Sequence, residues 1–456
     1  MKAASFGGGM NPLGTSPTRK LVWRFAIPAI MGNLVDALYN ITDQIFIGHG
    51  VGMLGNAATN VAFPITTIAT AVSLLIGIGA ASNFNLEQGR GNLRKASFMA
   101  GNGISLALLC GVGLTALIII FLRPLLSAFG ATESVLPLAH TYTGITSLAL
   151  PFLIFKGVCS QLIRADGSPA YSMFCLMSGA LLNIILDPIF IFVLDMGIAG
   201  AAWATLISQG FSALVALLYV RRFRTVSLGP RCLIPRWIHA KSIAALGAAA
   251  CINQLAITLV HITMNNVLGF HGAGSVYGSE APLAVTGVIS KVNAVIIALT
   301  VGISQGCQPI FGYNYGAGNF ARVRRTFRTA AVMVTSVSMA AYVCLQLFPH
   351  EIVSIFGGGT EEYFAFGERY LRIYMSMMFL NGILPLSSNF FTSIGKASRG
   401  ILLSMMRQLV FRLPLIVFLP YVMGIEGALY AGPAADIGGL LLSTALLYRE
   451  FRRMPA

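Results

Sequence analysis

Long apolar runs recur along the chain and are separated by short polar segments. A transmembrane helix needs about 20 consecutive apolar residues, and twelve runs reach this length. Several are longer, so we expect tilted or kinked helices, with Pro28, Pro64 and Pro414 as candidate kink sites. The expected spans are 20–48, 55–84, 98–122, 134–163, 171–194, 199–220, 242–270, 282–311, 328–349, 363–392, 401–423 and 428–448.

The polar segments alternate in charge. Segments at one side of the expected spans carry most of the Lys and Arg, those at the other side carry Asp and Glu, and Arg123 is the main exception. Cytoplasmic loops are the basic ones, so both termini are expected in the cytoplasm. The net charge of +15 is therefore a topology signal that also suits anionic lipid headgroups, and we expect no nucleic-acid partner.

Composition supports the same class. The chain has 456 residues, of which 56% are hydrophobic and 10% charged, whereas soluble domains average about 25% charged residues. The seven cysteines are scattered without metal-binding spacing, and no residue pattern typical of an enzyme or a phosphate loop stands out. We expect an all-α polytopic protein of the cell inner (plasma) membrane, monomeric, without a cofactor, and driven by an ion gradient.

Two halves of the chain resemble each other. "QGRGNLRKASF" (88–98) matches "YGAGNFARVRRTF" (315–327), and Gly167 in "RADGSP" pairs with Gly395 in "SIGKAS". Parallel repeats of this kind are common in transporters, whose substrates bind between the halves. The expected division is a disordered cytoplasmic N-terminus (1–18), an N-lobe of six spans (19–220), a cytoplasmic linker (221–241) and a C-lobe of six spans (242–450).

Carboxylates inside the first and fifth spans suggest a functional site. Asn33, Asp36, Asn40 and Asp43 recur at helical spacing, which places them on one face. A charge at the bilayer centre costs at least about 2.5–3.5 kcal/mol, so such a stripe is more typical of a water-filled cavity than of a plain polar seam between helices.

Asn183 and Asp187 also share a helix face, because they lie four residues apart. The following Pro188 has no N–H and loosens the helix locally. The alternative is that Asp187 merely lies at the end of its span.

The acids belong to the first half alone in this comparison of the repeats. Asp43 aligns with Met264, Asn40 with His261, and Asp187 with an apolar residue near Leu413. A purely structural requirement would be expected in both halves. The asymmetry favours a cation or proton site in the first lobe.

Several motifs resemble the multidrug and toxic compound extrusion (MATE) transporters over residues 19–450: "YNITDQIFIG", "RADGSP", "NIILDPIFIF", "GIAGAAWATLISQ" and "QPIFGYNYGAGN". The sequence is most similar to the prokaryotic branch with coupling acids in the N-terminal lobe. The resemblance implies a site for H+ or Na+, with Pro28 as a hinge; its residues would be Asp43, Asp187, Asn183, Thr205 and Tyr142. A sodium ion would take Asp43, Asn183, Asp187 and Thr205 as ligands. Asp36 lies outside the family pattern, so its role is open, and we group it with the coupling residues.

Five residues are candidates to line the path of the cargo. Asn33, Asn40, Tyr39, Met264 and Lys291 are candidates, although Met and aromatic residues are also ordinary in bilayer-facing positions. Lys291 in a C-lobe cavity would favour an anionic or zwitterionic cargo, whereas snorkelling to the interface explains Lys156 and Arg407.

These patterns predict a cation-coupled antiporter that exports structurally diverse, cationic amphipathic drugs by alternating access. The alternatives are a flippase of lipid-linked or other envelope precursors, and a channel.

Overall fold

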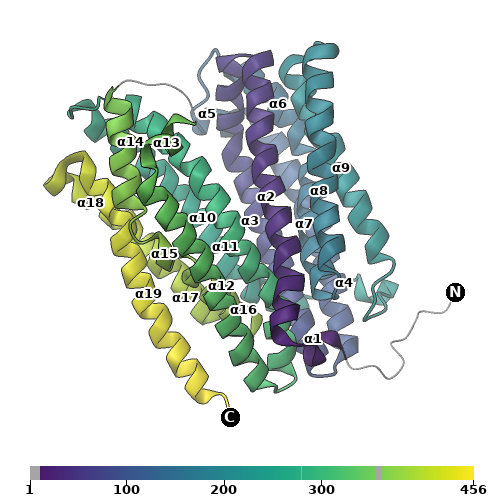
Figure 1. The fold of residues 1–456 in the computed structure, drawn as a ribbon. Coiled ribbons are helices and arrows are strands. Elements are labelled where there is room, and N and C mark those ends of the chain that lie inside the picture. Colours follow the sequence, from purple (N-terminus) through teal and green to yellow (C-terminus); the bar gives the residue numbers. More distant parts are fainter. Residues whose placement is uncertain (1–10, 279, 356–360, 456) are drawn as a thin grey trace.

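The computed structural model describes residues 11–278, 280–355 and 361–455. Within these ranges the secondary structure is helical, without a strand. Long helices run side by side in two bundles, one from the purple-to-teal half of the chain and one from the green-to-yellow half (Figure 1). The short helix α1 (Pro12–Thr15) and the C-terminal end of α19 (Gly427–Arg453) lie at the same end of the molecule.

The first bundle follows the expected order of six spans. Pro151 follows the first residue of α7, where its missing N–H favours the 47° bend between α6 and α7. α5 (Leu122–Ala128) joins α4 to α6. The spans are α2 (Thr18–Gly50), α3 (Met53–Gly89), α4 (Leu93–Ile120), the pair α6 (Leu136–Ser147) and α7 (Leu150–Ala165), α8 (Pro169–Pro188) with the π-helical turn η1 (Ile189–Val193), and α9 (Gly197–Val220).

The second bundle is more broken. Its spans are α10 (Trp237–Ala273), α11 (Glu280–Gly316), α12 (Phe320–Leu347), the interrupted helix α14 (Glu361–Tyr374), α15 (Met378–Asn381) and α16 (Ile383–Ser393), then α17 (Ala397–Met405) with the π-helix η3 (Met406–Arg412) and α18 (Leu413–Met423), and finally α19. Short elements between them are η2 (Pro230–Cys232), α13 (Pro349–Ser354) and η4 (Gly424–Glu426).

The helices account for twelve spans. Nine stretches of the described chain are long and apolar enough to cross a membrane, or ten when α6 and α7 count as one. One stretch, Ala397–Arg453, has 57 residues, far more than one crossing needs, and η4 divides it into two spans. The interrupted helix α14–α16 is the remaining span, so the twelve-span, all-α prediction is confirmed.

The repeated motifs adopt the same local structure in both halves. Gly91 and Gly318 have φ angles of 80° and 76°, and Gly167 and Gly395 have 88° and 82°. Glycine reaches this left-handed region at little steric cost, which explains its presence at these helix ends. The internal repeat seen in the sequence is thus a repeat of turns as well as of spans.

Residues 11–18 correct the prediction of a disordered N-terminus, whose residues 1–10 lie outside the described ranges. Leu13 is buried, and its carbonyl accepts a 2.9 Å hydrogen bond from Asn314 Nδ2. Arg322 Nη2 donates to the Ser16 carbonyl at 2.7 Å. The prediction was wrong for residues 11–18 because their apolar and carbonyl groups find partners on α11 and α12.

The linker between the bundles is held on the first one. Asp166 accepts hydrogen bonds from the backbone N–H groups of Arg224 at 2.7 Å and Thr225 at 3.0 Å, and from the Tyr219 hydroxyl at 2.9 Å. Burial raises the pKa of the Asp166 carboxyl, and these hydrogen bonds oppose the rise. The linker therefore starts as part of the N-terminal bundle.

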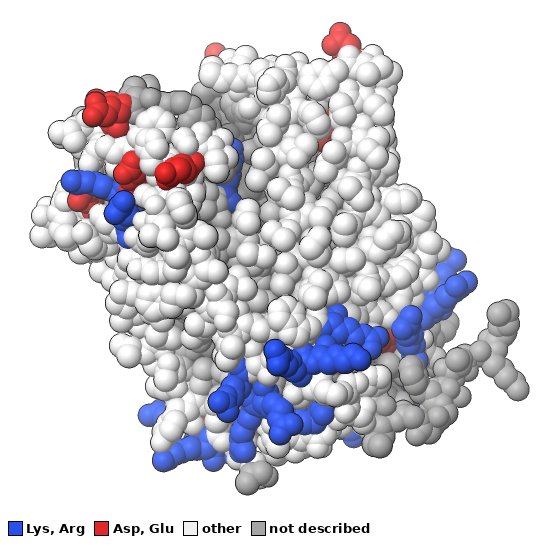
Figure 2. Space-filling model, in the orientation of Figure 1, with Lys and Arg blue, Asp and Glu red and all other residues white. Residues whose placement is uncertain are grey.

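Charged side chains gather at the two ends of the visible face. Lys and Arg cluster at the end where α1 lies, most Asp and Glu lie at the opposite end, and a wide uncharged zone separates them (Figure 2). Many large apolar side chains are exposed, including Leu117, Ile185 and Phe211. This pattern suits a protein that crosses a bilayer with all twelve spans.

Candidate functional site

Two acids and an asparagine meet inside the first bundle. Asp43 on α2 is 8% exposed and Asp187 on α8 is fully buried. Their carboxyl groups lie within hydrogen-bonding reach of each other. Asn183, one turn before Asp187 on α8, donates from Nδ2 to Asp187 Oδ1 at 3.1 Å. The structure thus brings together three of the predicted coupling residues.

Four oxygens at this site are buried and have no hydrogen-bond partner within the described chain: Asp43 Oδ1, Asp187 Oδ2, Asn183 Oδ1 and Thr205 Oγ1. An unsatisfied buried polar group costs about 1–3 kcal/mol. A proton or a small cation would supply the missing partner. Among the described residues no cluster of three or more His, Cys, Asp or Glu forms a metal site, so a sodium ion would need the amide and hydroxyl oxygens as well.

Two tyrosines close the site, Tyr142 from α6 and Tyr39 from α2 itself. Tyr142 on α6 is buried and lies within electrostatic range of Asp43. Tyr39, one turn before Asp43 on α2, lies within electrostatic range of Asp43 and close to Thr205 on α9. The site therefore draws on four helices of the first bundle: α2, α6, α8 and α9.

The backbone next to Asp187 is irregular. α8 ends at Pro188, and the π-helical turn η1 follows it directly. Proline lacks the N–H that would continue the α-helical pattern, and π-turns frequently mark functional sites. The predicted loosening at Pro188 is present, and it sits one residue from the buried acid.

A cavity of about 470 Å³ lies between the two bundles. Its walls come from α2 and α3 on one side and mainly from α10, α11, α14–α16, α17 and η3 on the other. Its size is in the range of drug-binding pockets. The charged side chains that line it are Asp36, Arg407 and Arg412.

The polar stripe of α2 divides between the two sites. Asn33 and Asp36 line the cavity, as does Met264, whereas Asp43 faces Asp187. Asn40 is exposed, and its Nδ2 donates to the Asp36 carbonyl at 2.6 Å.

Two other predicted residues lie apart from both sites. Lys291 is exposed and is not among the residues that line the cavity. Pro28 lies inside the continuous helix α2.

The second bundle contains a charged cluster that the sequence interpretation missed. Arg407 donates from Nε to Asp436 Oδ1 at 3.0 Å and also contacts Asn381 Oδ1. Its side chain is 11% exposed, so snorkelling was the wrong explanation, and Lys156 is likewise buried. The available signal was Asp436 inside the apolar run "AGPAADIGG", together with the two arginines of the preceding span.

Arg412 belongs to the same cluster and feels the charge of Asp436, but it forms no ion pair within the described chain. It donates to the Tyr374 hydroxyl and, at 3.4 Å, to Gln408 Oε1. Its Nε is buried and without a hydrogen-bond partner in the described chain. The guanidinium also lies over the Tyr374 ring, 4.9 Å from the centroid.

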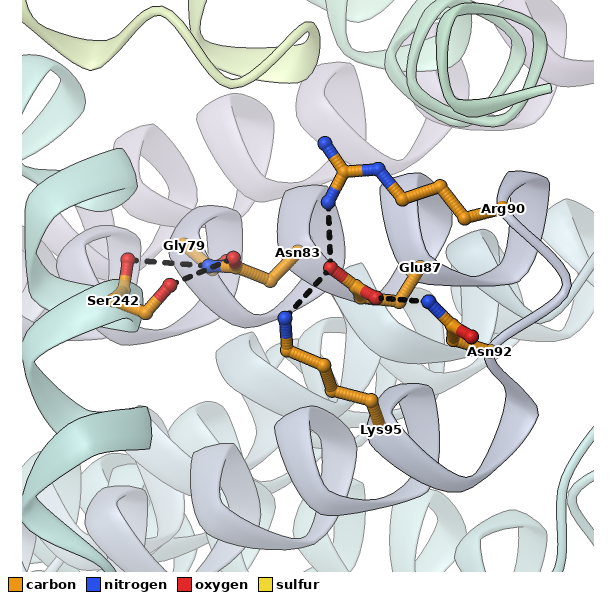
Figure 3. Close-up of polar contacts among 7 residues, drawn as sticks. All are labelled: Gly79, Asn83, Glu87, Arg90, Asn92, Lys95 and Ser242. Carbon is orange, nitrogen blue, oxygen red and sulfur yellow. Dashed lines mark hydrogen bonds and ion pairs between the residues drawn. The ribbon is translucent and has the colours of Figure 1, made fainter.

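The bundles touch closely along α3 and α10. Asn83 Nδ2 donates to the Ser242 carbonyl at 3.1 Å, and Ser242 Oγ donates to Asn83 Oδ1 at 2.9 Å (Figure 3). A Cβ on Gly247 would lie 1.7 Å from the Leu75 carbonyl oxygen, so only glycine permits this approach. We call this contact the α3–α10 seam.

A buried acid lies one turn beyond the seam. Glu87 accepts hydrogen bonds from Arg90 Nη1 at 2.7 Å, Lys95 Nζ at 3.0 Å and Asn92 Nδ2 at 3.1 Å (Figure 3). Arg90 and Asn92 lie in the turn between α3 and α4, and Lys95 lies in the first turn of α4. The seam therefore closes the space between the bundles near their basic end.

Comparison with protein families places both halves of the chain in one family. A family model described as MatE matches residues 28–189 and 249–418. The two matched segments begin in α2 and α10, the first spans of the two bundles.

Individual proteins resemble the chain over nearly its whole length. The "Multidrug export protein MepA" of Staphylococcus haemolyticus is 24% identical over 436 residues, which cover 95% of this chain and 94% of that protein. The solved structure of the MATE multidrug transporter DinF-BH is 31% identical, with a TM-score of 0.87 over 94% of this chain and 95% of that chain. An outward-facing MATE family transporter has a TM-score of 0.91 at 22% identity and covers 99% of both chains.

Proposed function

Because the chain belongs to the MatE family, the multidrug and toxic compound extrusion transporters, we propose that it exports structurally diverse, cationic amphipathic drugs in exchange for H+ or Na+. It is a transporter and not an enzyme. The observation that carries the proposal is the pair Asp43 and Asp187, buried in contact with each other and surrounded by unpartnered oxygens.

The acid pair supplies the ion chemistry. Two carboxylates in contact within an apolar bundle repel each other when both are ionised, so the pair favours one bound proton or sodium ion. Asn183 orients Asp187 for this role through its amide N–H. Thr205 adds a hydroxyl oxygen that a sodium ion would use as a ligand and that a proton would not require. Dependence on Thr205 therefore distinguishes sodium coupling from proton coupling.

Coupling requires that the ion prefer one conformation of the protein. A ligand shifts a conformational equilibrium only through its different affinity for the two states. The acid pair does not line the cavity, so it attracts a cationic cargo there only through longer-range electrostatics. An ion that neutralises the pair removes this attraction, and a tenfold weakening of cargo binding needs only about 1.4 kcal/mol. By linkage the cargo must weaken ion binding by the same factor. Cargo and ion then exclude each other, which is the basis of antiport.

The α3–α10 seam supports alternating access between two lobes. With the basic end facing the cytoplasm, as the positive-inside rule requires, the seam separates the cavity from the cytoplasm. The lobes are residues 19–220 and 242–450, joined by the linker 221–241, and both termini are cytoplasmic. Export then requires the seam to part so that cargo enters, and to close again before release at the other side.

Equilibrium binding tests this mechanism. Purified protein in nanodiscs is titrated with a fluorescent organic cation across pH, with and without sodium, for the wild type and for Asp43→Asn. We expect acid pH or sodium to weaken cargo binding about tenfold or more, and the effect to vanish in Asp43→Asn. Asp195→Asn is the matched control, because Asp195 is exposed beyond η1. If the wild type binds the cargo with the same affinity at every pH and with or without sodium, the competition between cargo and ion is refuted.

A further inference from the structure

The cavity between the lobes carries opposite charges on its two walls. Asp36 stands on the N-lobe wall and Arg412 on the C-lobe wall. Neither forms an ion pair within the described chain: Arg412 has only a hydroxyl and an amide partner, and Asp36 lies beyond ion-pair distance of Lys156, the cation that acts on it. The first lobe's acid pair does not line this cavity, so the two sites are distinct.

The neighbouring arginine shows what is unusual about Arg412. Arg407 lines the same cavity, but Asp436 behind it neutralises its charge at 2.9 Å. Arg412 has five N–H donors, of which neutral groups take two, and its Nε is buried and unused. Two arginines therefore share one buried carboxylate, Asp436, which is paired with Arg407 and acts on Arg412 only from beyond ion-pair distance. An anionic ligand would balance the positive charge that remains.

The surroundings of Arg412 favour a carboxylate. The planar guanidinium matches a carboxylate with two parallel hydrogen bonds, which a lysine would not provide. The Tyr374 ring lies against one face of the guanidinium and its hydroxyl accepts from Nη2, so the group is held in one orientation. Arg412 also closes the π-helix η3, whose wide turns present Gln408 and Arg412 together to the cavity.

We propose that the C-lobe wall is an anion subsite, in which Arg412 binds the carboxylate of a zwitterionic amphipathic cargo whose cationic part faces Asp36. The cavity of about 470 Å³ holds one drug-sized molecule. This inference rests on the proposed export function and names a substrate class for it. The N-lobe acids keep their role with the ion, and Arg412 selects the cargo.

Two dyes that differ in one group provide the test. Rhodamine B carries a free carboxylate at neutral pH, and its ethyl ester has the same ring system without that charge. Binding of each to purified protein in nanodiscs is measured by fluorescence polarisation for the wild type, Arg412→Gln and Arg412→Lys. Arg372→Gln is the matched control, because Arg372 is an exposed arginine on α14 of the same lobe.

We expect the wild type to bind the free carboxylate about tenfold or more tightly than the ester, since charge-assisted arginine–carboxylate pairs are among the stronger hydrogen bonds. Arg412→Gln should lose this preference while its affinity for the ester is unchanged, Arg412→Lys should keep part of it, and Arg372→Gln should behave as wild type. Unchanged ester binding also shows that the variant is folded.

A wild type that binds the free carboxylate no better than the ester overturns the subsite, including the case in which it binds neither dye. So does an Arg412→Gln variant that retains the preference. Either result leaves the proposed function intact if the effect of pH or sodium on an organic cation still depends on Asp43. Loss of that ion effect with a preserved carboxylate preference would instead refute the coupling and keep the subsite.

Discussion

The two lobes place opposite charges at corresponding irregularities of the backbone. In the first lobe Asp187 precedes Pro188 and the π-turn η1. In the second lobe Arg412 ends the π-helix η3, two residues before Pro414. The first site gathers two acids with unpartnered oxygens, and the second gathers two arginines around one acid, Asp436. The repeat therefore provides the same kind of scaffold twice, and the side chains decide its chemistry.

The lobes also differ in how their charges are compensated. Asp436 is neutralised by Arg407 inside the protein. Among the described residues, Asp43 and Asp187 have only each other, Asn183 and neutral oxygens as neighbours. A carboxylate neutralised by an arginine stabilises a fixed structure, whereas two acids without a counter-charge are suited to binding an ion. This difference leads us to place coupling in the first lobe even though both lobes bury carboxylates.

The largest effect is expected from Asp187→Asn, which keeps the volume and the contact with Asn183 but removes a carboxylate. Uptake of a fluorescent cation into inverted vesicles should lose its dependence on the ion gradient altogether, and Asp195→Asn should retain it. If Asp187→Asn vesicles accumulate the dye as fast as wild type, the first-lobe acids do not couple transport.

Arg407→Met should make the second lobe easier to unfold, because it leaves the buried Asp436 without its ion-pair partner. The expected loss of stability is about 3–5 kcal/mol. The double variant Arg407→Met with Asp436→Leu should recover much of this, since it removes both charges. Thermal unfolding of the detergent-solubilised protein measures the change, and a stable Arg407→Met single variant would show that Asp436 does not depend on its partner.

Asn83→Ala tests the seam at which the lobes meet. It removes two interlobe hydrogen bonds with Ser242, each worth about 0.5–1.5 kcal/mol. The population with the basic end open should rise by a factor of about 5–150, measurable as longer spin-label distances between the inner ends of α3 and α10. Ser97→Ala is the control, because its hydroxyl bonds within its own helix to the Leu93 carbonyl. Identical distance distributions for wild type and Asn83→Ala would exclude the seam as a gate.

The smallest effect is expected from Asp36→Asn. This exposed carboxylate acts on the cargo through water, where a single charge contributes about 1 kcal/mol or less. Affinity for an organic cation should fall by about fivefold or less, with the dependence on pH or sodium unchanged. A loss of gradient dependence as complete as in Asp187→Asn would place Asp36 in the coupling site after all.

Much of the fold could be predicted from the sequence because membrane helices are specified locally. A span needs a long apolar run, and a loop's charge decides its side of the membrane. Turn glycines such as Gly91 and Gly318 reveal the repeat because few other residues adopt their backbone angles. The structure of the interrupted helix α14–α16 and of residues 11–18 was harder to predict, since it depends on contacts with residues from elsewhere in the chain.

The candidate site shows the same division. Asn183 and Asp187 share a helix face by spacing alone, and the asymmetry between Asp43 and Met264 pointed to the first lobe. Helical spacing alone could not separate Asp43 from Asp36, because both lie on one stripe of α2. The family resemblance grouped Asp43 with Asp187, and the structure places Asp36 at the cavity instead. The sequence could not pair Arg407 with Asp436 either, as these residues are brought together by the packing of η3 against α19.

The sequence by itself determined a twelve-span helical protein with a repeated architecture and ionisable groups inside its spans, because hydrophobic length, loop charge and helical spacing act along the chain. The tertiary structure decided which of those charges are neutralised. The electrostatic energy of a buried charge depends mainly on whether an opposite charge lies within a few ångströms. Arg407 forms an ion pair with Asp436, whereas Arg412 forms none within the described chain. That difference arises between helices distant in sequence, so helix packing, not spacing along the chain, separates a structural ion pair from a binding site.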